Sequence, residues 1–517
     1  MRETQKMRPG IQRLLPFCRC CALLALLGGF LNACGGGSAG GAAATEVASS
    51  SAASSSGSST GTGSTTSTGT TGTSTPGSTT GSGAPSASSG SSTGSSSASP
   101  AVSTLTLTLP AQGLGPAVIV VQGDATSEAI ASYYQSKRGI PEANIIRVNL
   151  PTRSDAMSAA DFAVLKADLD AKLPSGVQAT LLTWTAPSRV AGSCSMGITS
   201  ALALGFDAKY CGSGCTTTAA SAYFDSESAR PWSSHGIRPS MMLGASTLAA
   251  AQALIDRGAS ADASYPTGDG YVLRTSDAAR SVRYPDYSKL PTLWPGSTGL
   301  QISYQDNSTG TSSDTVQSKP HVLFYFTGLA QVAGITSNSY VPGAAADHLT
   351  SYGARLPNGN GQMLVTAWLD AGATASYGTV DEPCNYTQKF SQASVLMDHY
   401  YRGDTLLEAY WKSVQWPGQG LFVGEPLAQP FRNSASLAIV AGQYAISTRG
   451  LRPGSHYSLE YRIAPSSTWT TLASFTGSRS QPVTLSAPLP PASATHLRWV
   501  GPCAADASQQ CTLSSSS

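Results

Sequence analysis

The strongest constraint on the fold is a regular alternation of continuous apolar runs with helical patterns. Apolar runs at residues 116–123, 145–150 and 178–186 alternate with helical patterns at 124–139 and 158–173. Continuous apolar runs are typical of parallel strands that are buried on both faces of a sheet. Strands joined through helices favour right-handed crossovers and a layered architecture. The sequence therefore predicts an α/β domain with a doubly wound, mostly parallel sheet.

The same kinds of segment continue to residue 432, so we assign residues 105–432 to this α/β domain. Residues 281–319 are rich in Pro, Ser, Gly and Thr, which predicts a long surface excursion. The other segments predict further strands and helices. Strands are expected at 238–244, 271–274, 321–327, 373–377 and 421–423, and helices at 246–255, 364–369, 397–402 and 406–414.

The pattern changes after residue 432. Tyr457, Leu459, Tyr461 and Ile463 alternate with polar residues, which is the period of a half-buried strand. Runs of similar length flank this segment and are separated by turn residues. Residues 433–502 are therefore expected to form a small β-sandwich that resembles a fibronectin type III domain.

The first 104 residues are expected to serve export rather than folding. Residues 1–33 combine a basic start with a short apolar run, which predicts a signal peptide. Their end, Leu-Asn-Ala followed by Cys34-Gly35, resembles the lipobox of bacterial lipoproteins, which implies a lipid on Cys34 and a membrane partner. The next residue is Gly35 rather than the aspartate that often retains lipoproteins in the inner membrane, so the outer membrane is the expected location. Residues 34–104 are Ser, Gly, Thr and Ala with almost no large apolar group, so we expect a disordered tether.

Charge and cysteine usage narrow the function further. Removing residues 1–33 takes away five basic residues and one acidic residue, so 26 basic and 28 acidic residues would remain. No basic patch is present, which argues against a nucleic-acid partner. The cysteines beyond Cys34 are expected to form disulfides in an oxidising compartment. Cys503 and Cys511 are expected to pair and close the tail at 503–517, whereas Cys194, Cys211, Cys215 and Cys384 leave three pairings open.

Sequence motifs for common chemistries are absent. From residue 105 onward the chain has no Walker A motif, no GxGxxG after the first strand, no HExxH and no GxSxG. The six histidines are scattered, so neither a metal site nor a cofactor is expected. One constellation remains. Cys384 could act as a nucleophile with His348 as its base, and Asp347 or Glu382 could orient the imidazole; the alternative is a disulfide for Cys384 and a structural role for His348.

Six stretches between residues 115 and 432 resemble a bacterial family of secreted and lipid-anchored proteins that has no established reaction. The matching stretches are 136–145, 238–242, 342–353, 372–385, 408–414 and 424–431.

The strand order and the turn at 424–427 also resemble, remotely, the caspase- and gingipain-type cysteine peptidases. This resemblance implies a catalytic histidine and glycine after one strand and a nucleophilic cysteine after the next. Here Thr327-Gly328 occupies the first position and lacks the histidine. Residues 347–351 occupy the second position and lack the cysteine. The resemblance therefore supports a fold and counts against peptidase activity.

Two functions from different classes follow. The first is a lipid-anchored, extracytoplasmic binding or assembly protein that holds a glycan or a protein, with Tyr410, Trp411 and Trp416 as candidate groove residues. The second is a cysteine-dependent hydrolase that uses Cys384 and His348. We favour the first, because the peptidase positions are empty and disulfides explain the cysteines.

Overall fold

A computed structural model describes residues 114–503, except for 213, 295–299, 433–435, 449–450, 452–455 and 478–482. The predicted signal peptide, the lipidation site Cys34 and the tether lie outside these residues. The predicted pair Cys503–Cys511 also depends on residues outside them. No helix within the described ranges is long and apolar enough to cross a membrane.

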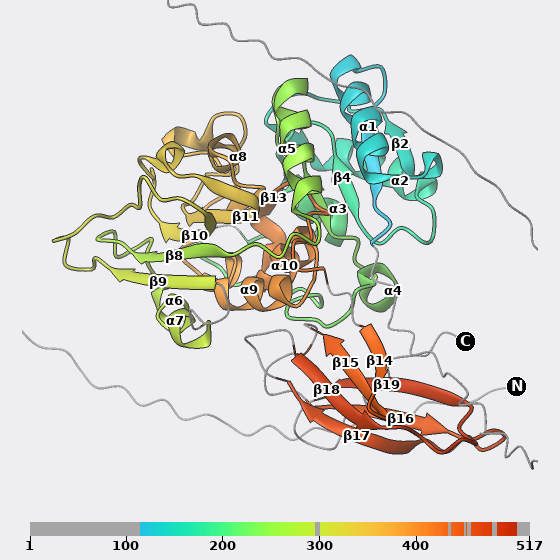
Figure 1. Cartoon of the computed structure of the whole chain (residues 1–517). Coiled ribbons are helices and arrows are strands. Elements are labelled where there is room, and N and C mark those ends of the chain that lie inside the picture. The colour runs from blue at the N-terminus through green and yellow to red at the C-terminus, as the bar shows by residue number, and fades with distance from the viewer. Residues whose placement is uncertain are drawn as a thin grey trace, which may run out of the picture. The chain divides into compact units, whose positions relative to one another are not determined.

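The centre of the chain is a ten-stranded sheet in the order β2-β1-β4-β7-β13-β12-β11-β10-β8-β9 (Figure 1). Within the described residues every neighbouring pair is parallel except β12 with β13. The prediction of an α/β fold with a mostly parallel, doubly wound sheet is therefore confirmed. The strands are β1 (Ala117–Val121), β2 (Ile145–Val148), β4 (Thr180–Leu182), β7 (Ser240–Met242), β8 (Gly268–Arg274), β9 (Leu300–Asp306), β10 (Val322–Gly328), β11 (Tyr340–Leu349), β12 (Ala375–Thr379) and β13 (Gly420–Gly424).

The antiparallel pair divides the sheet into two halves that run in opposite directions. β13 is parallel to β7 and antiparallel to β12. The carboxyl ends of β8 to β12 therefore lie at the opposite edge from those of β1, β2, β4 and β7. Loops at the carboxyl ends of parallel strands are the usual place for ligand sites, so each half has its own candidate edge.

Helices cover both faces of the sheet. Adjacent residues of a strand point to opposite faces: Phe422 stacks on Trp411 of α10, whereas Val423 belongs to the same apolar cluster as Leu369 of α8. The helices are α1 (Ala125–Arg138), α2 (Ala159–Lys172), α3 (Ile198–Leu204), α4 (Pro231–His235), α5 (Leu248–Ala261), α6 (Tyr284–Tyr287), α7 (Leu290–Leu293), α8 (Thr366–Ala371), α9 (Ala393–Tyr401) and α10 (Leu406–Ser413).

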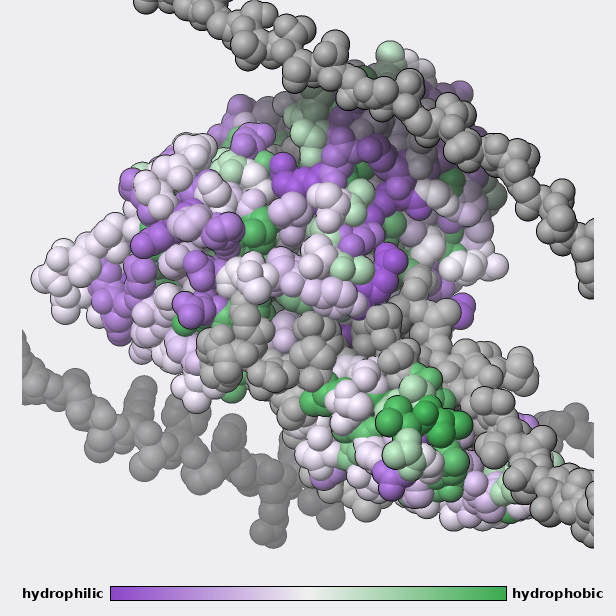
Figure 2. Space-filling view, viewed as in Figure 1, coloured by the Kyte–Doolittle hydropathy of each residue, from purple (hydrophilic) through white to green (hydrophobic). Residues whose placement is uncertain are grey.

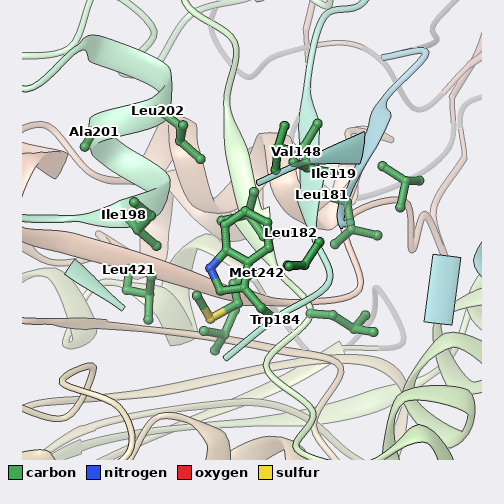
Figure 3. Packing of buried hydrophobic residues seen from close by; sticks show 14 of the residues in the cluster. Ile119, Val148, Leu181, Leu182, Trp184, Ile198, Ala201, Leu202, Met242 and Leu421 are labelled. Carbon is green, nitrogen blue, oxygen red and sulfur yellow. The ribbon is translucent and has the colours of Figure 1, made fainter. Parts of the chain in front are cut away.

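Local sequence signals explain where the first helices begin and end. Asp124 caps α1 by accepting a hydrogen bond from the Ser127 backbone at 2.7 Å, and Gly139 ends the helix with φ of 63°. Ser158 caps α2 in the same way through Asp161. Apolar side chains of α3 pack toward the strands that carry Leu181, Leu182 and Met242 (Figure 3). These features confirm the predicted boundaries in this part of the chain.

The surface excursion predicted for residues 281–319 is partly wrong. Residues 300–306 form β9, which pairs with β8 along its whole length and ends the sheet. Its side chains are buried on one face only. An edge strand of this kind carries a weak apolar signal, which the surrounding Pro, Ser, Gly and Thr residues outweighed.

Two small antiparallel sheets follow residue 432 and share an apolar core that includes Tyr457, Leu459 and Trp499. They confirm a β-sandwich-like arrangement. Apolar surface is visible on this part of the chain (Figure 2), where β14 exposes Ile439 and Val440. The strands are β14 (Ser436–Val440), β15 (Gln443–Thr448), β16 (His456–Arg462), β17 (Thr470–Thr476), β18 (Val483–Pro488) and β19 (His496–Cys503).

A third small sheet joins β3 (Ala156–Ser158), β5 (Arg189–Ala191) and β6 (Ser195–Gly197). β3 and β5 pair in parallel, and β5 and β6 pair antiparallel.

Candidate functional site

The candidate site is the edge loop, which we define as residues 380–391 between β12 and α9. It leaves the sheet at the carboxyl end of β12, where ligand sites of parallel sheets are expected. Cys384 and Asn385 have φ of 55° and 58°. Left-handed backbone at residues other than glycine is uncommon and concentrates at functional sites and tight turns. The edge loop therefore combines a favourable place in the fold with an unusual backbone.

Disulfides fix the edge loop to a distant part of the chain. The four cysteines whose pairing was open form the bonds Cys194–Cys211 and Cys215–Cys384. The second bond joins the loop to a segment 169 residues earlier. Near it, the Tyr386 hydroxyl donates a hydrogen bond to the Cys215 carbonyl at 3.4 Å. The disulfide and this hydrogen bond thus both attach the edge loop to Cys215.

Cys384 has no thiolate in this oxidised state, because its sulfur is bonded to Cys215. Glu382 acts on the backbone of the same turn: its carboxylate accepts a hydrogen bond from the Cys384 amide at 2.9 Å. The Glu382 carbonyl accepts another from the Gln419 side chain at 3.1 Å. These two contacts give Glu382 a role in shaping the loop.

His348 lies on β11 and is buried, with 1% of its surface exposed. Its Nδ1 accepts a hydrogen bond from the Trp368 indole at 3.0 Å, so its Nε2 carries the proton and donates to the Met363 carbonyl at 3.1 Å. Burial lowers the pKa of His348 to about 4, although the hydrogen bond to Met363 acts in the opposite direction. The imidazole is neutral, fixed in one tautomer and engaged at both nitrogens.

Asp347 points to the other face of β11, as expected for the neighbour of His348 in a strand. Its carboxylate forms a buried ion pair with Arg283 at 2.7 Å and accepts a hydrogen bond from the Ser391 hydroxyl. Arg283 also donates to the Thr327 carbonyl at 2.6 Å. Arg283 and Asp347 therefore tie the carboxyl ends of β10 and β11 to the edge loop.

The four predicted catalytic residues are not assembled into one relay. Among the described residues, no hydrogen bond joins His348 to Cys384, Asp347 or Glu382. Each of the four instead bonds to a different partner. Asp347 and His348 are adjacent residues of a strand, so their side chains point to opposite faces of the sheet. The sequence therefore already contained a reason not to expect them in one relay.

Backbone packing leaves no space for a side chain at Gly328, the last residue of β10. A Cβ placed on Gly328 would lie 1.8 Å from the Arg280 carbonyl oxygen, so a larger residue cannot replace this glycine without a shift of the chain. Thr327 is fully buried beside it. This edge of β10 is thus tightly packed against the segment that carries Arg280.

The three aromatic residues predicted for a groove lie in different environments. Tyr410 and Trp411 are fully buried in the core. Trp416 is only half-buried, and its ring lies 5.6 Å from that of Tyr386 on the edge loop. Tyr386, also half-buried, was missed by the sequence interpretation; a tyrosine within an otherwise polar loop was the available signal. We call Trp416 and Tyr386 the aromatic pair.

Lys389 lies next to the Tyr386 ring. Its side chain is buried, and its Nζ has no hydrogen-bond acceptor within the described residues. Burial lowers the pKa of Lys389 to about 8, against the opposing attraction of Glu382 and Asp381. Its Nζ lies 5.2 Å from the centre of the Tyr386 ring, within the range of a cation–π contact. The amine is thus close enough to attract the face of the Tyr386 ring.

The side chains of the described residues contain no group of three or more His, Cys, Asp or Glu that could hold a metal ion.

Comparisons with known proteins add little to this description. No protein-family model and no curated protein matches the chain. One solved structure, described as "Structure of Protease", is similar to it at 12% sequence identity, over 72% of this chain and 97% of that one, with a TM-score of 0.35. Similarity at this level does not transfer an activity, because one fold hosts many functions.

Proposed function

We propose that the chain is a lipid-anchored, extracytoplasmic binding protein that holds a glycan on the aromatic pair. The observation that carries this proposal is the half-exposed pair Trp416–Tyr386, with ring centres 5.6 Å apart. Aromatic side chains offer large, flat apolar surfaces, which can pack against the C–H faces of sugar rings.

The aromatic pair is held in place before any ligand arrives. The Trp416 amide donates to the Gln388 carbonyl at 2.8 Å, which ties the tryptophan to the edge loop. The Cys215–Cys384 disulfide fixes the middle of that loop. A preorganised surface loses less conformational entropy on binding, so more of the contact energy contributes to affinity.

The edge loop that carries Tyr386 also carries polar side chains. Asp381, Glu382, Asn385 and Gln388 are all partly exposed on the edge loop. Carboxylates and amides supply the acceptors and donors that sugar hydroxyls require. Their presence on the loop that carries Tyr386 supports a glycan over a purely apolar ligand.

Cysteine-dependent hydrolysis receives less support from the same residues. A hydrolase of this kind needs a thiolate and a base that can take its proton. Cys384 is oxidised and both nitrogens of His348 are engaged. Binding uses the edge loop as it stands and requires no such rearrangement.

The anchor and location rest on the sequence of residues 1–104. The lipobox-like sequence that ends at Cys34 supports acylation of this cysteine, and the Gly35 that follows it supports attachment to the outer membrane. The tether at 34–104 supports a folded part held away from the bilayer.

A glycan array followed by calorimetry of the best ligands tests this proposal. Replacing Trp416 by alanine is expected to weaken binding by about tenfold or more, as for aromatic anchors of other binding sites. Trp469 is a matched control, because it is also half-buried but lies on the β-sandwich. Equal affinity of wild type and W416A, or the absence of any bound glycan, would overturn the proposal.

A further inference from the structure

A second feature lies in the other half of the sheet, at the start of β4 and β7. A cavity of about 200 Å³ opens there between α2, the end of α3 and α4. Four leucines form much of its apolar wall, and three charged side chains and one indole are also among the lining residues. The residues used below are Leu169, Leu173, Leu202, Leu204, Lys166, Asp170, Arg238 and Trp232.

Arg238 is held in a fixed orientation at this cavity. Its Nε donates a hydrogen bond to the Val177 carbonyl at 3.1 Å. Its guanidinium lies 3.4 Å from the centre of the Trp232 ring, which is a stacking contact. The two terminal nitrogens have no hydrogen-bond or ion-pair partner among the described side chains and backbone. The planar end of Arg238 is therefore preorganised and free to donate.

The charges around the cavity leave Arg238 without a close counterion. Asp170 forms its ion pair with Lys166 on the same helix. Burial lowers the pKa of Arg238, and Asp170 only partly offsets this. The lowered pKa reflects the free-energy cost of burying a charged guanidinium. An anion bound at the guanidinium would offset this cost. The last turn of α3 also lines the cavity, and because carbonyl oxygens at a helix end repel anions, an anionic group is favoured at the Arg238 side.

We propose that this cavity binds a small carboxylate with a short branched apolar chain. The carboxylate accepts two hydrogen bonds from the terminal nitrogens of Arg238, in the bidentate geometry that guanidinium and carboxylate share. The apolar chain packs against the leucine wall. A free carboxylic acid and the C-terminal residue of a peptide present this same chemistry. Arg238 and its surroundings match none of the groups used in the glycan proposal, so the two stand independently.

Calorimetry on the full chain distinguishes the possibilities with three probes. 4-Methylpentanoate carries the proposed chemistry, and 4-methylpentanamide has the same shape without the charge. An N-acetylated tripeptide ending in leucine presents the carboxylate from a peptide. The acid is expected to bind at least tenfold more tightly than its amide. Binding of the peptide as well assigns the site to peptide C-termini, and binding of the acid alone assigns it to free acids.

Variants locate the binding at Arg238. R238Q is expected to weaken acid binding by about ten- to a hundredfold. The affinity of R238K should lie between those of wild type and R238Q, because lysine keeps the charge but loses the bidentate geometry of the guanidinium. L204F fills the cavity while it leaves Arg238 unchanged, and it should also abolish binding. R230Q is the control, since Arg230 is exposed and lies outside the cavity. Equal binding of acid and amide, no binding of either, or wild-type affinity in both R238Q and L204F would overturn the proposal.

Discussion

Replacing His348 by glutamine tests whether this residue is a structural group or a base. Glutamine is neutral at all relevant pH values and can both accept from the Trp368 indole and donate to the Met363 carbonyl. A base that takes a thiol proton needs a pKa near neutrality. The structure instead lowers the pKa of His348 to about 4, mainly through burial.

The magnitude follows from proton linkage. In the unfolded chain the imidazole has its ordinary pKa of 6.5, so between pH 6.5 and 4 the unfolded chain binds a proton that the folded protein does not. The stability that this difference contributes is present above pH 6.5 and is lost as the pH falls toward 4. Since one pKa unit corresponds to about 1.4 kcal/mol, the loss is about 3 kcal/mol.

Glu408 changes the pH dependence of stability in the opposite direction to His348. The difference between wild type and H348Q is therefore more informative than the pH dependence of wild type alone. Burial raises the pKa of Glu408 to about 7, and its contribution to stability is therefore lost as the pH rises from 4.5. Subtracting the H348Q profile from the wild-type profile removes this shared term.

Chemical denaturation at pH 7.5 and 4.5 provides the assay. Wild type should lose about 2.5 kcal/mol more than H348Q between these two values, because pH 4.5 is still slightly above the pKa of the folded protein. H456Q is the control, because His456 is exposed on the β-sandwich. Parallel pH profiles for wild type and H348Q would refute a buried, neutral His348.

Three further predictions address the buried pair, the disulfide and the anchor. D347A should lower the free energy of unfolding by about 3–5 kcal/mol, because it leaves the Arg283 charge buried without its partner. In denaturant titrations, R283L/D347L should recover most of that loss. A loss below about 1 kcal/mol in D347A would contradict the buried ion pair. C215A/C384A should lose about 5 kcal/mol, the chain entropy of a 169-residue loop, in calorimetric melts, and an unchanged melting temperature would argue against the bond. C34S should move the protein from the membrane fraction to the soluble fraction, with a mass that lacks acyl chains; continued membrane association would count against the lipid anchor.

Much of the fold could be predicted from the sequence where burial is two-sided. Val118 to Val121 and Leu323 to Phe326 are buried throughout their strands, and such runs leave a continuous apolar signal. β9 was missed because an edge strand buries only one face. The opposite directions of the two halves also escaped prediction, because the antiparallel contact between β12 and β13 joins segments that are distant in sequence.

The candidate site was located better than it was understood. Glu382 and Cys384 were named as candidate residues from the sequence, and both lie in the edge loop. The partner of Cys384 could not be predicted, since pairing depends on how residue 215 is brought to the loop by the whole domain. The aromatic pair likewise forms between Tyr386 and Trp416, which only tertiary packing brings together.

Alkylation of the folded protein without reductant, followed by peptide mapping, tests the central claim most directly. If the edge loop is a disulfide-fixed binding platform, Cys215 and Cys384 should remain unlabelled and appear as one linked peptide pair. They should become labelled only after reduction. Stoichiometric alkylation of Cys384 in the unreduced, folded protein would contradict this account and would return the residue to the role of a free thiol nucleophile.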